Sequence, residues 1–178
     1  MHTRTRIGLS LAGAVACFVM LFSPAGQAGE RTVNLRYAGT GVATSVDPNG
    51  DGVPVDVTDT VTQGTFGQSR LVITTEWMIH PRACPAGYDL PFKLVNLGLV
   101  VTMPDHSQLF GFSQEGWICA NSTTGAYVGE SYGIYNGGAG RFVGATGEWM
   151  TKFDGYNIDL PVSFRSIRGT VEGKVATP

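Results

Sequence analysis

Charged residues are scarce in this chain. Lys, Arg, Asp and Glu make up 15% of the 178 residues, whereas an average soluble domain has about a quarter. The basic residues form no cluster and the formal net charge is −2, so we expect no nucleic-acid partner. Hydrophobic residues reach 43%, which argues against a disordered chain and predicts a folded domain with a substantial core.

Helical periodicity is also missing. No window of ten residues places apolar side chains at spacings of three and four, and Gly, Pro or β-branched residues interrupt every candidate. The 25 glycines show no Gly-x-y period, which excludes a collagen-like chain and predicts many tight turns or close backbone approaches instead.

The familiar catalytic and metal motifs are absent from the sequence. It contains no Gly-x-Ser-x-Gly elbow, no Cys-x-x-Cys pair and no zinc-ligand spacing. The glycine-rich stretch around residues 137–147 lacks the following helix that a phosphate-binding loop needs. No reaction can therefore be assigned from motifs, and whether the protein is an enzyme stays open.

Residues 1–28 have the three parts of a secretory signal peptide: a basic start, an apolar run and small residues before a cut after Ala28. The alternatives are a membrane anchor, for which the run is short, or a lipoprotein acylated at Cys17. We expect cleavage, which leaves residues 29–178 as a single domain with a net charge near −4. The mature protein would be secreted or periplasmic, with no membrane partner.

Two cysteines remain after this cleavage, Cys84 and Cys119. A pair of cysteines in an exported chain predicts one disulfide, and it would close a loop of about 36 residues, worth roughly 3–4 kcal/mol in the chain-entropy model. The alternative is a pair of free, buried thiols.

Short segments with strand-like patterns recur along the mature chain, separated by turn residues. They cover residues 31–39, 69–78, 92–103, 107–119, 125–135, 140–153 and 161–175. Seven or eight strands without helices between them predict an all-β domain that closes into a barrel or packs as a sandwich. We expect a closed antiparallel β-barrel of about eight strands, because closure removes exposed strand edges. The irregular segments at residues 44–64 and 79–91 are expected to be loops at the barrel mouth.

The stretch "GGAGRFVGATGEW", preceded by "GAYVGESYGIYN", resembles the superfamily of allene oxide cyclase and dirigent proteins, and within it the bacterial secreted members of unknown function. The resemblance implies an eight-stranded antiparallel barrel and often a trimer, hence a homo-oligomer. In that superfamily the plant cyclases bind a fatty-acid epoxide inside the barrel, and dirigent proteins steer the radical coupling of phenols. The resemblance identifies no catalytic residue in this chain, because the first predicted strand carries no acidic residue that could match a catalytic carboxylate.

Glu130 is the candidate catalytic residue. It alternates with Val128 and Tyr132, and if that face lines the barrel its carboxylate lies in an apolar interior that would raise its pKa. The alternative is an outward glutamate that packs against another subunit. Tyr132, Trp117 and Phe142 are the candidate ligand-binding side chains.

A possible metal site lies in the segment "DPNGDGVPVD". Asp47, Asn49 and Asp51 occupy alternate positions and Gly52 follows, as in the first half of a calcium loop. The match then fails, because Thr58 stands where a bidentate Glu is expected. The alternative is an acidic, turn-rich surface loop; no other cofactor is expected.

Two classes of function follow from these patterns. In the first, the barrel binds a small apolar or phenolic ligand; in the second, it is a non-catalytic extracellular barrel acting through surface loops and self-association. A cavity of several hundred Å3 would favour the first class, since ligand pockets hold about 300–1,000 Å3. A barrel plugged by aromatic side chains would favour the second; the candidates for such a plug are Phe110, Phe112, Trp117 and Phe142.

Overall fold

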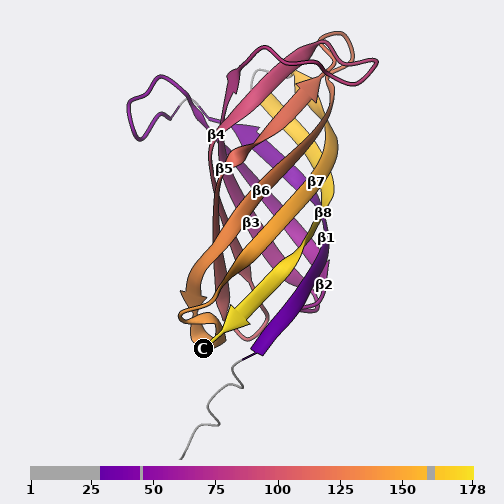
Figure 1. The fold of residues 1–178 in the computed structure, drawn as a ribbon. Coiled ribbons are helices and arrows are strands. Elements are labelled where there is room, and N and C mark those ends of the chain that lie inside the picture. Colours follow the sequence, from indigo (N-terminus) through magenta and orange to yellow (C-terminus); the bar gives the residue numbers. More distant parts are fainter. Residues whose placement is uncertain (1–28, 45, 160–162) are drawn as a thin grey trace, which may run out of the picture.

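The computed structural model describes residues 29–44, 46–159 and 163–178. Eight antiparallel strands form a closed barrel in which each strand pairs with its neighbours in sequence and the last pairs with the first (Figure 1). The predicted fold class is thereby confirmed; the signal peptide at residues 1–28 lies outside the described residues. The strands are β1 Gly29–Ala43, β2 Val55–Gly64, β3 Ser69–Ile79, β4 Leu90–Thr102, β5 Gln108–Ala120, β6 Ala126–Ala139, β7 Thr146–Asp159 and β8 Ser163–Thr177.

The half of the barrel near the C-terminus lies at the bottom of Figure 1. It contains much of the main buried hydrophobic cluster, including Val33, Val101, Leu109 and Val175. Its buried residues alternate along the strands, as the pattern predicted for β1, where Val33, Leu35 and Tyr37 are buried. At the end of this half, the rings of Phe66 and Phe142 pack edge to face, with centroids 5.4 Å apart. The cavities inside the barrel lie toward the opposite end.

Strand β2 corrects the prediction that residues 44–64 are all loop. The loop ends before Val55, and β2 then pairs with β1 and β3 over its length. Its pattern is inverted: the threonines at 58, 60 and 62 are buried inside the barrel, while Val57 and Val61 are exposed. A strand with polar residues inside and valines outside does not give the alternation expected of a half-buried strand.

The glycine-rich stretch also differs from its prediction. Strand β6 continues to Ala139, a 3-10 turn covers Gly140–Phe142, and β7 begins only at Thr146. Phe142 therefore does not lie on a strand. Its ring is buried at the closed end of the barrel from this turn.

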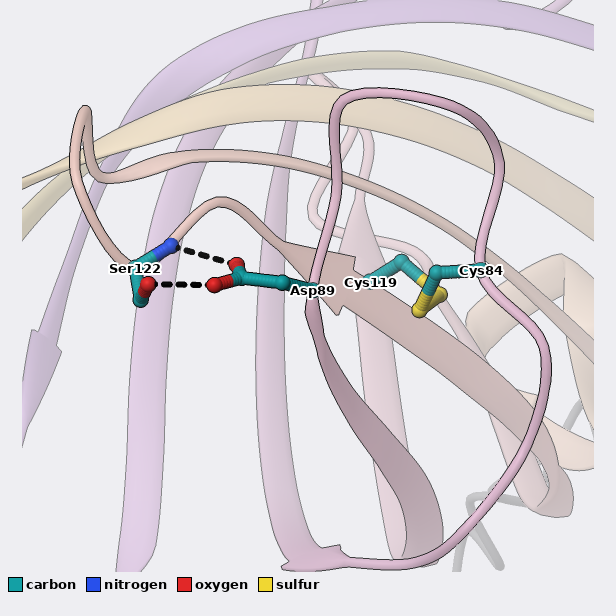
Figure 2. Close-up of a disulfide and its surroundings, with 4 residues drawn as sticks. All are labelled: Cys84, Asp89, Cys119 and Ser122. Carbon is teal, nitrogen blue, oxygen red and sulfur yellow. Dashed lines mark hydrogen bonds between the residues drawn. A yellow bond between two sulfur atoms is a disulfide. The ribbon is translucent and has the colours of Figure 1, made fainter.

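The segment between β3 and β4 is a loop, as predicted, and it is held at the mouth end by covalent and polar contacts. Cys84 and Cys119 form the predicted disulfide. Beside it, the backbone N–H and hydroxyl of Ser122 donate to the carboxylate of Asp89, at 2.8 and 2.5 Å (Figure 2). These contacts tie the loop to β5 and to the β5–β6 turn.

Among the residues that the structure describes, no helix is long and apolar enough to span a membrane.

Candidate ligand site at the barrel mouth

Two adjoining cavities lie at the mouth end of the barrel and share Trp77, Ile118, Tyr127 and Arg165 in their linings. The outer cavity has a volume of about 240 Å3, slightly below the usual range for small-molecule pockets. The inner one holds about 30 Å3, room for a water molecule or two. Of these two cavities, the outer one could therefore accept a ligand of about the size of one substituted aromatic ring.

The wall of the outer cavity is largely apolar. Strand β3 contributes Trp77, which reaches the interior after an irregularity in the β3–β4 register at Glu76 and Trp77. Strands β4, β5 and β6 add Phe92, Ile118 and Tyr127. Aromatic walls with a few polar groups are typical of ligand pockets, because apolar contact supplies affinity and the polar groups fix orientation.

Two buried tyrosines supply fixed hydroxyl groups below and beside this cavity. The Tyr127 hydroxyl donates to the carbonyl oxygen of Ser166 at 2.7 Å. The Tyr37 hydroxyl lies 2.9 Å from Oγ1 of Thr151, which itself donates to the carbonyl of Thr170 at 2.8 Å. Burial raises the pKa of both tyrosines well above their usual value, so both remain protonated and serve as hydrogen-bonding groups.

Among the described residues, one ion pair lies in the lining of the outer cavity, and it joins β8 to β2. Nη1 of Arg165 lies 2.8 Å from Oδ2 of Asp56, and the two side chains are only 19% and 12% exposed. Loss of water around Asp56 raises the pKa of its carboxyl, an effect that Arg165 opposes only in part. The mouth thus combines an apolar wall with one largely buried ion pair.

Glu130 lies on the outer surface of the barrel. On β6 the buried face is the opposite one, with Tyr127, Ser131 and Tyr135. The Glu130 carboxylate accepts a hydrogen bond from the Tyr132 hydroxyl at 2.7 Å and lies 3.7 Å from Nζ of Lys152. This is the outward alternative, so the desolvation argument for a catalytic Glu130 has no basis in this geometry.

The structure brings two of the candidate ligand-binding residues, Tyr132 and Trp117, beside Glu130 on the outer surface, where Trp117 is the register partner of Glu130 and lines the same shallow hollow. It does not place them in the barrel. Tyr132 is exposed on the outer face of β6, and Trp117 lies under the guanidinium of Arg82, 4.4 Å from its ring centroid. Phe142 is buried at the far end of the barrel. The four aromatic residues considered as a possible plug of the barrel do not close its mouth: Phe112 is exposed, and none of the four lines either mouth cavity.

The Asp47 loop is built from side-chain-to-backbone hydrogen bonds. The Asp47 carboxylate accepts from the N–H groups of Gly50 and Gly52, both at 2.8 Å. The Asn49 amide donates to Asp51 at 3.1 Å and lies 3.4 Å from the buried carboxylate of Glu76. In the described parts of the chain, no three His, Cys, Asp or Glu residues gather as a metal site. Calcium binding here stays a prediction.

The sequence offered little signal for the residues that line the mouth. Asp56 lies in the segment that the sequence predicts to be a loop, and Arg165 lies in a predicted strand with no signal that marks it as a site residue. Trp77 alternates in the sequence with Leu71, Ile73 and Thr75, and this is the face that the structure turns to the barrel interior. An Asp on β2 and an Arg on β8 could have been paired only by knowing that both strands flank β1.

The comparisons with known proteins found similarity among solved structures alone. No family model matches the chain, and no curated protein matches it. Among solved structures it is similar to a pterocarpan synthase dirigent protein, with 11% sequence identity, 81% of this chain and 84% of that chain covered, and a TM-score of 0.32. The barrel itself is established by the strand order of this chain.

Proposed function

We propose that this protein is an exported barrel that binds a small aromatic or otherwise apolar molecule in the cavity at its mouth. The observation that carries the proposal is the cavity of about 240 Å3 walled by Trp77, Phe92, Ile118 and Tyr127, with one ion pair at its edge. Burying an aromatic ring against such a wall is favourable by about 25 cal/mol per Å2 of apolar surface removed from water.

Export is part of the same proposal. It is supported by the leader-like composition of the N-terminal segment and by the Cys84–Cys119 disulfide, because such bonds persist mainly in oxidising compartments. Binding requires no chemical step.

A blocked-pocket variant tests the proposal. Ala120 is buried in the lining of the outer cavity, so Ala120→Phe should fill the cavity with its ring. Val143→Phe is the control, because Val143 is 65% exposed and follows the turn at the closed end.

Native mass spectrometry of the secreted protein, followed by thermal-shift measurements with small aromatic compounds, would compare the two variants. We expect ligand-dependent stabilisation of the wild type and of Val143→Phe, and none of Ala120→Phe. A response that survives in Ala120→Phe, or a wild type that binds none of the compounds, would refute binding at the mouth.

The second class of function, self-association, is favoured by a different observation. Phe112 and Ile134 face each other on the outer surface of β5 and β6 and are 37% and 55% exposed, beside the exposed Tyr132. Exposed apolar groups of this kind are typical of interaction surfaces. Analytical ultracentrifugation of the wild type and of Ile134→Glu tests it: an oligomer that dissociates on this substitution supports the proposal, and a monomeric wild type refutes it.

A further inference from the structure

The guanidinium of Arg165 has unused hydrogen-bonding capacity at the mouth. It is the one basic side chain that lines the outer cavity among the described residues. A guanidinium carries five N–H donors, and its side chain here is 19% exposed. Its Nε is buried and has no hydrogen-bond acceptor in the described part of the chain, although leaving a buried donor without an acceptor is costly.

Asp56 occupies only one corner of that guanidinium. The contact joins Nη1 of Arg165 to Oδ2 of Asp56 at 2.8 Å. The Nε edge is not engaged by Asp56 through any such contact. An oxyanion entering the cavity could take the free edge, since planar two-point binding of carboxylates is the geometry that guanidinium groups favour.

We propose that the ligand of the mouth cavity is an aromatic carboxylate, whose carboxylate binds the free edge of Arg165 and whose ring lies against Trp77 and Tyr127. This inference rests on the proposed function, since it specifies the chemistry of the molecule that the same cavity holds. The wall supplies apolar contact to the ring, and Arg165 supplies the one positive charge that the described residues bring to the lining.

Asp56 has a defined role in this arrangement. Its carboxylate competes with the ligand for Arg165 and repels a second negative charge beside it. Burial makes Asp56 easier to protonate, because its pKa lies above the ordinary value. Neutralising Asp56 should therefore strengthen binding of an aromatic carboxylate, whereas removing Arg165 should weaken it. A residue pair with a purely structural role would not produce opposite effects.

The test uses two probes that differ only in charge, 2-naphthoate and 2-naphthamide, with isothermal titration calorimetry on the mature wild-type protein. We expect 2-naphthoate to bind on the order of tenfold more tightly, the gain typical of a charge-assisted hydrogen bond. Arg165→Met should remove that advantage and leave the affinity for 2-naphthamide unchanged. Asp56→Asn should increase the affinity for 2-naphthoate alone.

Arg168→Met is the matched control. Arg168 lies on the same strand but points outward, where it pairs with Asp154 and is 75% exposed. Arg168→Met should leave the affinities for 2-naphthoate and 2-naphthamide at their wild-type values. Circular dichroism would show that each variant is folded, and the comparison of the two probes on the wild type needs no variant.

The outcomes separate this inference from the proposed function. Equal affinities of the wild type for the two probes, or an equal loss of both in Arg165→Met, would overturn the carboxylate inference while the cavity remained a binding site. If neither probe binds, or if both bind equally well to Ala120→Phe, the inference and the mouth site fail together.

Discussion

The side chain of Arg165 crosses Gly41 to reach Asp56. Gly41 on β1 is the register partner of Arg165 on β8 and of Thr58 on β2, and Arg165 and Asp56 meet at 2.8 Å inside the mouth. A Cβ atom on Gly41 would meet Oγ1 of Thr58 and the Cγ of Arg165. The ion pair at the mouth therefore depends on a residue without a side chain between its two strands.

Gly41→Ala should displace Arg165 and separate this pair. We expect a loss of about 1–3 kcal/mol in the free energy of unfolding, the usual cost of inserting a methyl group into a packed site. Urea denaturation would measure it, with Gly98→Ala as the control, because a Cβ there would meet only the Thr74 hydroxyl. Equal effects of the two substitutions would contradict the close approach at Gly41.

The charge of Asp56 should make stability depend on pH in an identifiable direction. Burial raises the pKa of Asp56 above its ordinary value of 3.8. Between the ordinary and the raised value, the folded protein retains a proton that the unfolded chain has lost. Stability from this group is therefore full below pH 3.8 and falls as the pH rises through that window.

Asp56→Asn removes this dependence. As the pH rises, the free energy of unfolding of the wild type should therefore fall relative to that of the variant. Asp59→Asn on the same strand is the control of opposite sign, because Arg70 lowers the pKa of Asp59. Its contribution is present above the ordinary value and is lost as the pH falls through the lowered one. Urea denaturation between pH 3 and about pH 7 would show both slopes; parallel slopes would contradict the assignment.

Glu130→Gln should have almost no effect on stability or on ligand binding. The Glu130 carboxylate lies on the outer surface with an exposed Lys152 at 3.7 Å, and exposed pairs contribute about 0–1 kcal/mol. We expect a change in the free energy of unfolding within about 0.5 kcal/mol and no change in ligand affinity at the mouth. A substantial loss of binding by calorimetry would restore Glu130 as a functional residue.

Removal of the disulfide should cost more than any of these surface changes. Cys84 and Cys119 are 35 residues apart in sequence, and closing a loop of this length in the unfolded chain is worth about 3–4 kcal/mol in the chain-entropy model. The double variant Cys84→Ala/Cys119→Ala should lose about that much in urea denaturation. A non-reducing and a reducing measurement on the wild type provide the control, since reduction should reproduce the loss.

The sequence predicted the barrel because most strands carry their apolar residues on the buried face. Leu71 and Ile73 on β3 are an example, and both lie inside. It failed for β2, whose buried side is made of threonines. The pattern of β6 does not identify its inward face, because both faces carry aromatic and small residues. The sequence therefore leaves Glu130 as a candidate interior acid. The ion pair between Asp56 and Arg165 could not be predicted from the sequence, because the two residues are brought together only by closure of the barrel.

The threonines of β2 lead to a last prediction. Thr60 is 2% exposed, and its hydroxyl donates to the carbonyl oxygen of Leu71 at 3.0 Å. Thr60→Val keeps the shape and removes that bond, so we expect a loss of about 0.5–1.5 kcal/mol in the free energy of unfolding. Val61→Thr, on the exposed face of the same strand, should change it by less than about 0.5 kcal/mol. Urea denaturation of both would decide whether hydroxyl bonding, rather than apolar burial, holds β2 against the interior; a more stable Thr60→Val would show that it does not.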